Sequence, residues 1–146
     1  MSLKPIPDGF HAVTPYLFDQ RASRLIEFIS AAFDGELTFR QTRPDGAIMH
    51  ATMQVGDSML MLADAIPPLG PMPASIYLYV HDSDAVYHSA LNAGGVSVFP
   101  IMTCLRVNGM AASKTPAATF GGWPPTSKMC HLTSSNGAGK NSKCRR

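Results

Sequence analysis

The same succession of predicted elements occurs twice in the sequence, and this repeat constrains the fold more than any other feature. Tyr16-Leu17 recurs as Tyr77-Leu78, and Asp34-Gly35 recurs as Gly94-Gly95, in each case about 60 residues later. Repeats of this length correspond to one supersecondary unit each. A chain of 146 residues favours one domain. We therefore expect two similar modules within a single domain.

The first module, residues 10–64, has the order strand, helix, three strands. Residues 11–18 alternate around Pro15, which suits a strand near a sheet edge. Apolar residues then recur at spacings of three and four, the period of a helix with one buried face, until Asp34-Gly35 ends the run. Turn sequences separate the strands that follow. The predicted elements are strands at 11–18, 36–43, 47–55 and 58–64 and a helix at 21–33.

The second module begins in the same way after a proline-rich connector, residues 66–73. A strand at 75–81, a helix capped by Asp82 or Ser83, and a strand at 96–99 are predicted. Two more strands should follow, but the sequence becomes rich in Gly, Ala and Pro and has little periodicity. We expect an α+β fold of paired βαβββ modules in which the second module is incomplete or altered.

The charge also changes near residue 103. Residues 1–103 hold all ten acidic residues and five basic ones, whereas residues 104–146 hold seven basic residues and no acidic one. The basic residues are scattered, so nucleic-acid binding is a weak alternative. Cys104, Cys130 and Cys144 lack the paired spacing of zinc ligands, so zinc binding is weaker still.

Nine short segments carry a resemblance to a known family, namely residues 14–17, 26–28, 32–33, 44–46, 48–51, 56–58, 60–64, 77–80 and 93–94. With these segments the chain resembles the vicinal oxygen chelate superfamily of glyoxalases, bleomycin-resistance proteins and extradiol dioxygenases, and within it the PhnB-like branch. The match is dense through Met102 and then stops, which defines a family-like domain at 1–102 and a tail at 103–146. The resemblance implies a homodimer.

The tail departs from the family in a way that a lost nucleotide explains. Family members continue with a segment like D-P-x-G-x-x-W-x-[LV]-A-T-H, which is absent. Reading one nucleotide upstream, however, lets the codons of residues 121–126 encode W-W-[VLM]-A-T-H. We hypothesise that residues 103–146 are a frameshifted C-terminus. A natural, divergent tail is the alternative.

The resemblance also implies where a superfamily metal would be bound. Alignment puts Thr14, Met61 and Ser75 at the first three ligand positions, and the fourth falls in the tail. None of these is a good ligand for a divalent ion. His11 would need a register slip that also turns it to the other face. We predict no metal site and no cofactor.

The same alignment gives one sheet face an aromatic and methionine-rich character. We predict that Tyr16, Met59, Met61, Tyr77 and Tyr79 line a ligand-binding cavity, for which a flat apolar or cationic small molecule is suited. An ordinary core is the alternative interpretation of these residues. We interpret His50, in the middle of a strand, as a structural histidine.

These expectations favour a small-molecule-binding protein of the glyoxalase/bleomycin-resistance kind. The alternative is a metal-dependent lyase, isomerase or dioxygenase of the same superfamily, and enzymatic activity itself is left open. No apolar run is long enough to cross a bilayer, so we expect no membrane partner. The N-terminus has no signal-peptide pattern, so we expect a cytoplasmic protein.

The frameshift hypothesis predicts the sequence of the source gene. Restoring one G after the Met102 codon should recover a reading frame that ends in the family segment and an acidic C-terminal helix. Sequencing the gene from its source tests this prediction. If no such frame can be recovered there, the tail is a natural divergent segment.

Overall fold

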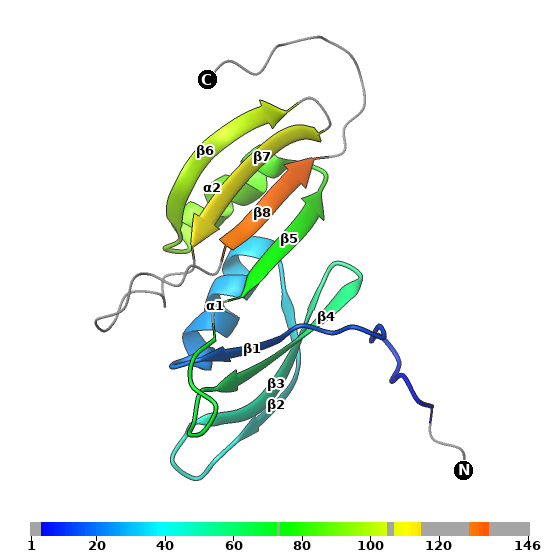
Figure 1. Ribbon diagram of the computed structural model, residues 1–146, viewed down its shortest axis with the longest axis vertical. Coiled ribbons are helices and arrows are strands. Elements are labelled where there is room, and N and C mark those ends of the chain that lie inside the picture. Colours follow the sequence, from blue (N-terminus) through cyan, green and yellow to red (C-terminus); the bar gives the residue numbers. More distant parts are fainter. Residues whose placement is uncertain (1–3, 73, 105–106, 115–128, 135–146) are drawn as a thin grey trace.

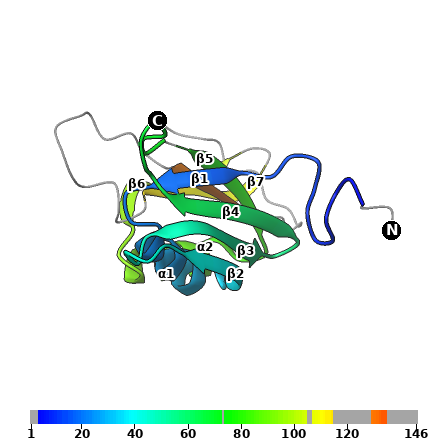
Figure 2. The ribbon, with the colours of Figure 1, turned by 90° about the horizontal axis from the view of Figure 1, so that it is seen from below.

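The computed structural model describes residues 4–72, 74–104, 107–114 and 129–134, with side chains through Val98 and at Ile101 (Figure 1). The described residues form two four-stranded sheets, each accompanied by one helix. Both helices lie on the same side of the molecule (Figure 2). In the described parts of the chain, no helix has the length and apolar character needed to cross a membrane.

The first sheet has the order β1-β4-β3-β2, which places the first strand beside the last. Strands β2, β3 and β4 form the predicted antiparallel meander, and β1 then pairs in parallel with β4. The parallel pair puts Tyr16 opposite Met61 and Leu17 opposite Leu62. The elements are β1 (Tyr16–Asp19), α1 (Ala22–Phe33), β2 (Glu36–Thr42), β3 (Ile48–Val55) and β4 (Ser58–Asp64).

The second sheet repeats this topology in the order β5-β8-β7-β6. Its first strand again pairs in parallel with its last, and Asp82 caps α2 by accepting a hydrogen bond from the Ala85 N–H at 2.9 Å. The elements are β5 (Ser75–Val80), α2 (Ser83–Asn92), β6 (Val96–Cys104), β7 (Val107–Lys114) and β8 (Met129–Ser134).

The structure confirms the predicted α+β fold of paired βαβββ modules and corrects two of its details. The first strand begins at Tyr16 and not at residue 11, because the Thr14 hydroxyl donates to the His11 carbonyl at 3.2 Å and Pro15, which has no N–H, pairs with β4 only through its carbonyl. In the second module, β6 runs past Phe99, and β7 and β8 complete the sheet. The rest of the predicted tail, residues 105–106, 115–128 and 135–146, lies outside the described residues.

Two carboxylates hold the N-terminus of α1. Its first turn contains no acidic residue, and Arg21 at the N-cap makes no side-chain capping bond. Instead Asp64, at the end of β4, accepts from the Ala22 N–H at 2.7 Å and from the Ile48 N–H at 2.6 Å. Asp19 accepts from the Arg21 N–H at 3.0 Å. Both carboxylates also face the positive end of the helix dipole.

At the C-terminal end of α1, position 35 has no room for a side chain and therefore requires glycine. Asp34 adopts the left-handed conformation at φ 57° that ends the helix, and the Gly35 N–H donates to the Ile29 carbonyl at 3.3 Å. A Cβ on Gly35 would lie 2.7 Å from Ile29 Cγ2. The predicted Asp34-Gly35 stop is therefore confirmed, with Asp34 rather than Gly35 in the left-handed position.

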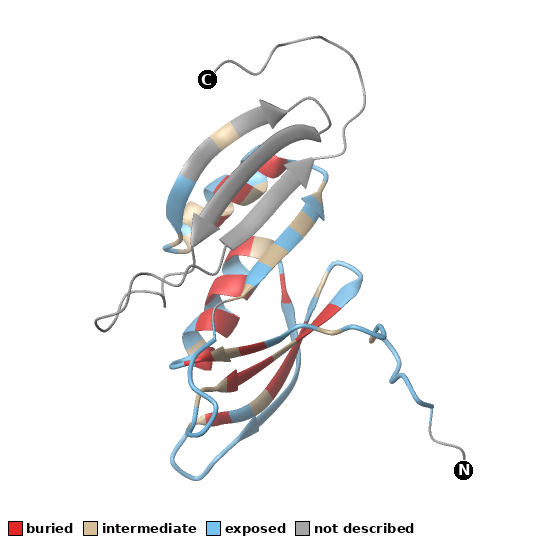
Figure 3. Ribbon diagram, viewed as in Figure 1, coloured by how far each residue is buried: buried red, intermediate tan, exposed pale blue. Residues whose placement is uncertain are grey.

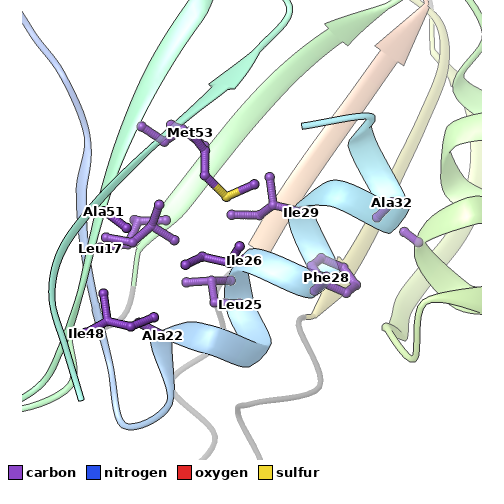
Figure 4. Packing of buried hydrophobic residues seen from close by; sticks show 13 residues of the cluster. Leu17, Ala22, Leu25, Ile26, Phe28, Ile29, Ala32, Ile48, Ala51 and Met53 are labelled. Atoms are coloured by element: carbon purple, nitrogen blue, oxygen red, sulfur yellow. The ribbon is translucent and has the colours of Figure 1, made fainter. Parts of the chain in front are cut away.

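Among the described side chains, the larger cluster of buried hydrophobic residues lies between α1 and the first sheet (Figures 3 and 4). Strand positions alternate between the helix side and the other side, except at the register shift beside Met49, where Ile48 is buried. Leu25, Ile48, Met53 and Leu62 are the largest fully buried side chains among those described. The helix contributes its stripe of Leu25, Ile26, Phe28 and Ile29. Burying each such side chain contributes about 1.5–3 kcal/mol.

The two modules join through their helices and β5. Helix α1 packs against α2, and Ala74 and Ile76 of the second module pack on the core of the first. A cavity of about 30 Å³ lies on this side, lined only by apolar side chains. Its lining residues are Leu17, Leu25, Phe28, Ile29, Phe33, Val55, Leu60, Ala74, Ile76 and Leu78.

The two hydrogen bonds of Asp64 predict a large stability effect. Asp64→Ala leaves the N–H groups of Ala22 and Ile48 buried without their acceptor and should lower the free energy of unfolding by about 3 kcal/mol. Asp64→Asn keeps one acceptor oxygen and should lower the free energy of unfolding by about half as much. Urea unfolding measures both.

Asp57→Ala is the matched control, because this exposed turn carboxylate is hydrogen-bonded to the Ser58 hydroxyl. The Asp57→Ala substitution should change the free energy of unfolding by no more than about 0.5 kcal/mol. An Asp64→Ala effect no larger than that of Asp57→Ala would show that Asp64 does not fasten the helix to the sheet.

Candidate functional site

Each sheet has one face toward the helices and one open face. In the first sheet Leu17, Leu60 and Leu62 face α1, so their neighbours on the strands face away from it. In β5, Ile76, Leu78 and Val80 are half-buried, whereas Ser75, Tyr77 and Tyr79 are exposed. A division into a core face and an open face is therefore present in the first sheet and in β5 of the second.

Of the five predicted ligand-binding residues, the three tyrosines are the most exposed. The exposed fraction is 41% for Tyr16, 42% for Tyr77 and 77% for Tyr79, and Met61 is half-buried. Met59 has an exposed fraction of only 8%. The N-terminal segment covers it, since the Cβ position at Gly9 lies 3.9 Å from Met59 Cγ.

The five residues form two groups, one on each sheet. Tyr16 lies directly opposite Met61 in the parallel pair of β1 and β4. The rings of Tyr77 and Tyr79 lie 5.1 Å apart on β5 and are tilted by 56°. The cavity between the modules touches neither group, because it lies on the helix side and is lined by other residues.

Three further side chains of the first open face join Tyr16. The Phe18 ring lies 4.4 Å from the Tyr16 ring. The Tyr16 hydroxyl is hydrogen-bonded to His50 Nδ1 at 3.2 Å, and the two rings are perpendicular. The Phe39 ring lies 6.1 Å from the imidazole. We call Tyr16, Phe18, Phe39 and His50 the aromatic cluster.

Sequence reasoning placed Tyr16 on this face but did not join Phe39 or His50 to it. The alternation of β3 carried the signal for His50, since it puts His50 on the same face as Thr52 and Gln54. Phe39 is less visible, because the register of β2 shifts between Leu37 and Phe39. The interpretation of His50 as a structural histidine is consistent with its half-buried position and its Tyr16 contact.

The residues at the implied metal-ligand positions do not fit a divalent metal. The Thr14 hydroxyl donates to the His11 carbonyl, Met61 offers only a thioether, and Ser75 only a hydroxyl. The fourth position falls in the tail, about whose side chains the structure gives nothing. Within the described residues, no three His, Cys, Asp or Glu side chains come together as a possible metal site.

No model of a known protein family matches the chain. Over 98 residues it is 35% identical to the uncharacterized protein Mb0911c of Mycobacterium bovis and to the uncharacterized protein Rv0887c of Mycobacterium tuberculosis. These matches cover 60% of this chain, 64% of the first protein and 58% of the second. The chain therefore spans less than two thirds of the length of these relatives.

Solved structures share the fold at low sequence identity. TioX from Micromonospora sp. ML1 is 18% identical with a TM-score of 0.63 and covers 85% of this chain and 98% of its own. A PhnB protein from Bacillus cereus, described as a putative 3-demethylubiquinone-9 3-methyltransferase, is 17% identical with a TM-score of 0.64. It covers 86% of this chain and 100% of its own.

A glyoxalase/bleomycin resistance protein from Streptomyces sp. CB03234 is also similar. It is 16% identical, has a TM-score of 0.55 and covers 83% of this chain and 100% of its own. These structures confirm the resemblance in fold that the sequence indicated. Their coverage exceeds the share of the chain in residues 1–102, so the likeness continues into the tail.

The burial of the methionines predicts their order of oxidation by dilute peroxide. Met49 and Met72 are exposed and should be oxidised first, half-buried Met61 next, and Met53 and Met59 last. Peptide mass spectrometry over a time course measures the order. Oxidation of Met59 as fast as Met49 would contradict the cover by the N-terminal segment.

Proposed function

We propose that this chain, which has the fold of the glyoxalase/bleomycin resistance proteins, binds small, flat molecules on the open faces of its sheets. The observation that carries the proposal is the exposure of aromatic rings there. Tyr16, Tyr77 and Tyr79 keep 41–77% of their surface accessible, although the strands beneath them pack a core on the other side. Exposed rings gathered on one face are typical of binding surfaces.

The chemistry of these faces suits flat apolar or cationic ligands. Aromatic rings stack on other planar systems and attract cations through their electron-rich faces. Met61 adds a polarizable side chain that adapts to different shapes. Met59 lies under the N-terminal segment, so its contribution to binding requires that segment to move.

A homodimer would increase the enclosure of such a ligand. The two groups of predicted residues lie on separate sheets, and each is open to solvent in the single chain. A second copy packed over an open face would cover the tyrosines and give the ligand a second wall. We include this dimer in the proposal, and light scattering in solution measures it.

Metal-dependent lyase, isomerase or dioxygenase activity is not part of the proposal. Thr14, Met61 and Ser75 supply no charged or imidazole donor at the implied positions. A divalent metal retained in stoichiometric amount through purification would favour that alternative instead.

Naphthalene, a flat and uncharged probe, tests the proposal. The wild-type protein should bind it, and Tyr77→Ala combined with Tyr79→Ala should weaken binding by at least about fivefold, since two aromatic contacts of about 0.5–1.5 kcal/mol each are lost. Titration followed by the amide signals of an ¹⁵N-labelled sample gives both the affinity and the residues that respond.

Met49→Ala is the control, because Met49 is an exposed apolar residue of β3 that is not one of the predicted ligand-binding residues or of the aromatic cluster. The Met49→Ala variant should bind naphthalene with the same affinity as the wild type. The proposal fails if naphthalene does not bind, or if the shifted signals belong to the helices and not to β1, β4 and β5.

A further inference from the structure

The aromatic cluster contains one polar pair that the proposed function leaves without a role. The Tyr16 hydroxyl and His50 Nδ1 lie 3.2 Å apart, although they come from strands β1 and β3 with β4 between them. At this level β4 carries Ala63, which is opposite Phe18 and only 3% exposed. The small Ala63 side chain leaves room for the phenol and the imidazole to meet above it.

The chemistry of the two groups decides which of them donates. A phenolic hydroxyl is a good donor, and an imidazole nitrogen with a free lone pair is a good acceptor. The phenolic oxygen is a poorer acceptor, because its lone pair is delocalised into the ring. With the Tyr16 hydroxyl as the donor to Nδ1, the imidazole of His50 carries its hydrogen on Nε2.

Within the described residues, the Nε2 atom has no hydrogen-bond partner. The imidazole is half-buried, so an apolar molecule that covered it would remove water from an N–H group without replacing that bond. A ligand with a hydrogen-bond acceptor at this point would replace it. The pair thus distinguishes between flat molecules with and without an acceptor.

The surroundings of the pair indicate an uncharged ligand. Phe39 is 51% exposed, and its ring lies 6.1 Å from the imidazole, so a planar molecule can lie against it. The register partner of His50 on β2 is Gln41, and the partner of Met61 on β3 is Thr52. These partners are polar but carry no charge to offset that of an ionic ligand.

We propose that His50 and Tyr16 anchor a planar, uncharged aromatic ligand, with the His50 Nε2–H donating to a ring nitrogen or carbonyl oxygen while the ligand lies against Phe39. This inference rests on the proposed function and names the ligand class. Tyr16 acts as a positioning residue, since it fixes the orientation and the tautomer of the imidazole.

Naphthalene and quinoline are matched probes for the test. They have the same shape, but quinoline has a ring nitrogen that accepts a hydrogen bond. The ratio of the naphthalene dissociation constant to the quinoline dissociation constant is measured by NMR titration for the wild type and for His50→Phe. His50→Phe should lower this ratio about fivefold, the effect of one ordinary hydrogen bond. Taking the ratio removes differences in the hydrophobicity of the probes.

His88→Phe on α2 is the control and should leave the ratio unchanged, since His88 is an exposed helix residue that contacts Tyr87. A long-range ¹H–¹⁵N spectrum adds a second readout and should show the His50 hydrogen on Nε2. The inference is wrong if the His50 hydrogen lies on Nδ1 and Nε2 carries none. It is also wrong if the ratio of the naphthalene and quinoline dissociation constants is the same in the wild type and in His50→Phe.

These outcomes separate the two proposals. If both probes bind to the open face with an unchanged ratio, the polar anchor is wrong and the proposed binding function stands. If neither probe binds the wild-type protein, the binding function fails and the anchor fails with it.

Discussion

The carboxylate of Asp64 is the interaction on which the first module depends most. It ends β4, yet its two oxygens accept hydrogen bonds from the first residue of α1 and the first residue of β3. The side chain of Asp64 thus joins the N-terminus of α1 to the first residue of β3. Because α1 also packs against α2, the helix that Asp64 fastens is part of the contact between the two modules. Helix α1 therefore supports the first sheet on the face opposite its open face.

Sequence periodicity predicted the elements whose side chains alternate between a core and solvent. Helix α1 and strands β2 to β4 lie within one residue of their predicted bounds, because their apolar residues recur at the helix or strand period. Strands β7 and β8 were not predicted. Their Gly, Ala, Ser and Thr residues give no alternation, and the structure defines them by backbone pairing with β5 and β6.

The candidate site was harder to predict than the fold, because it depends on contacts between distant segments. The parity of the strands gave the correct face for Tyr16, Tyr77 and Tyr79. It could not reveal that the N-terminal segment covers Met59, since that segment has no period. The pair of His50 and Tyr16 likewise depends on the order of strands β1, β4 and β3, which brings together residues 34 positions apart.

The parallel pairing of β1 with β4 also affects how the chain folds while it is being synthesised. Strand β1 leaves the ribosome early, but its partner ends at Asp64, so β1 and the apolar face of α1 have no sheet to pack on until then. The antiparallel pair of β2 and β3 is local in sequence, whereas the parallel pair of β1 and β4 can form only after β4 has been synthesised. The nascent first module is therefore exposed to aggregation over this interval, and the second module repeats the delay with β5 and β8.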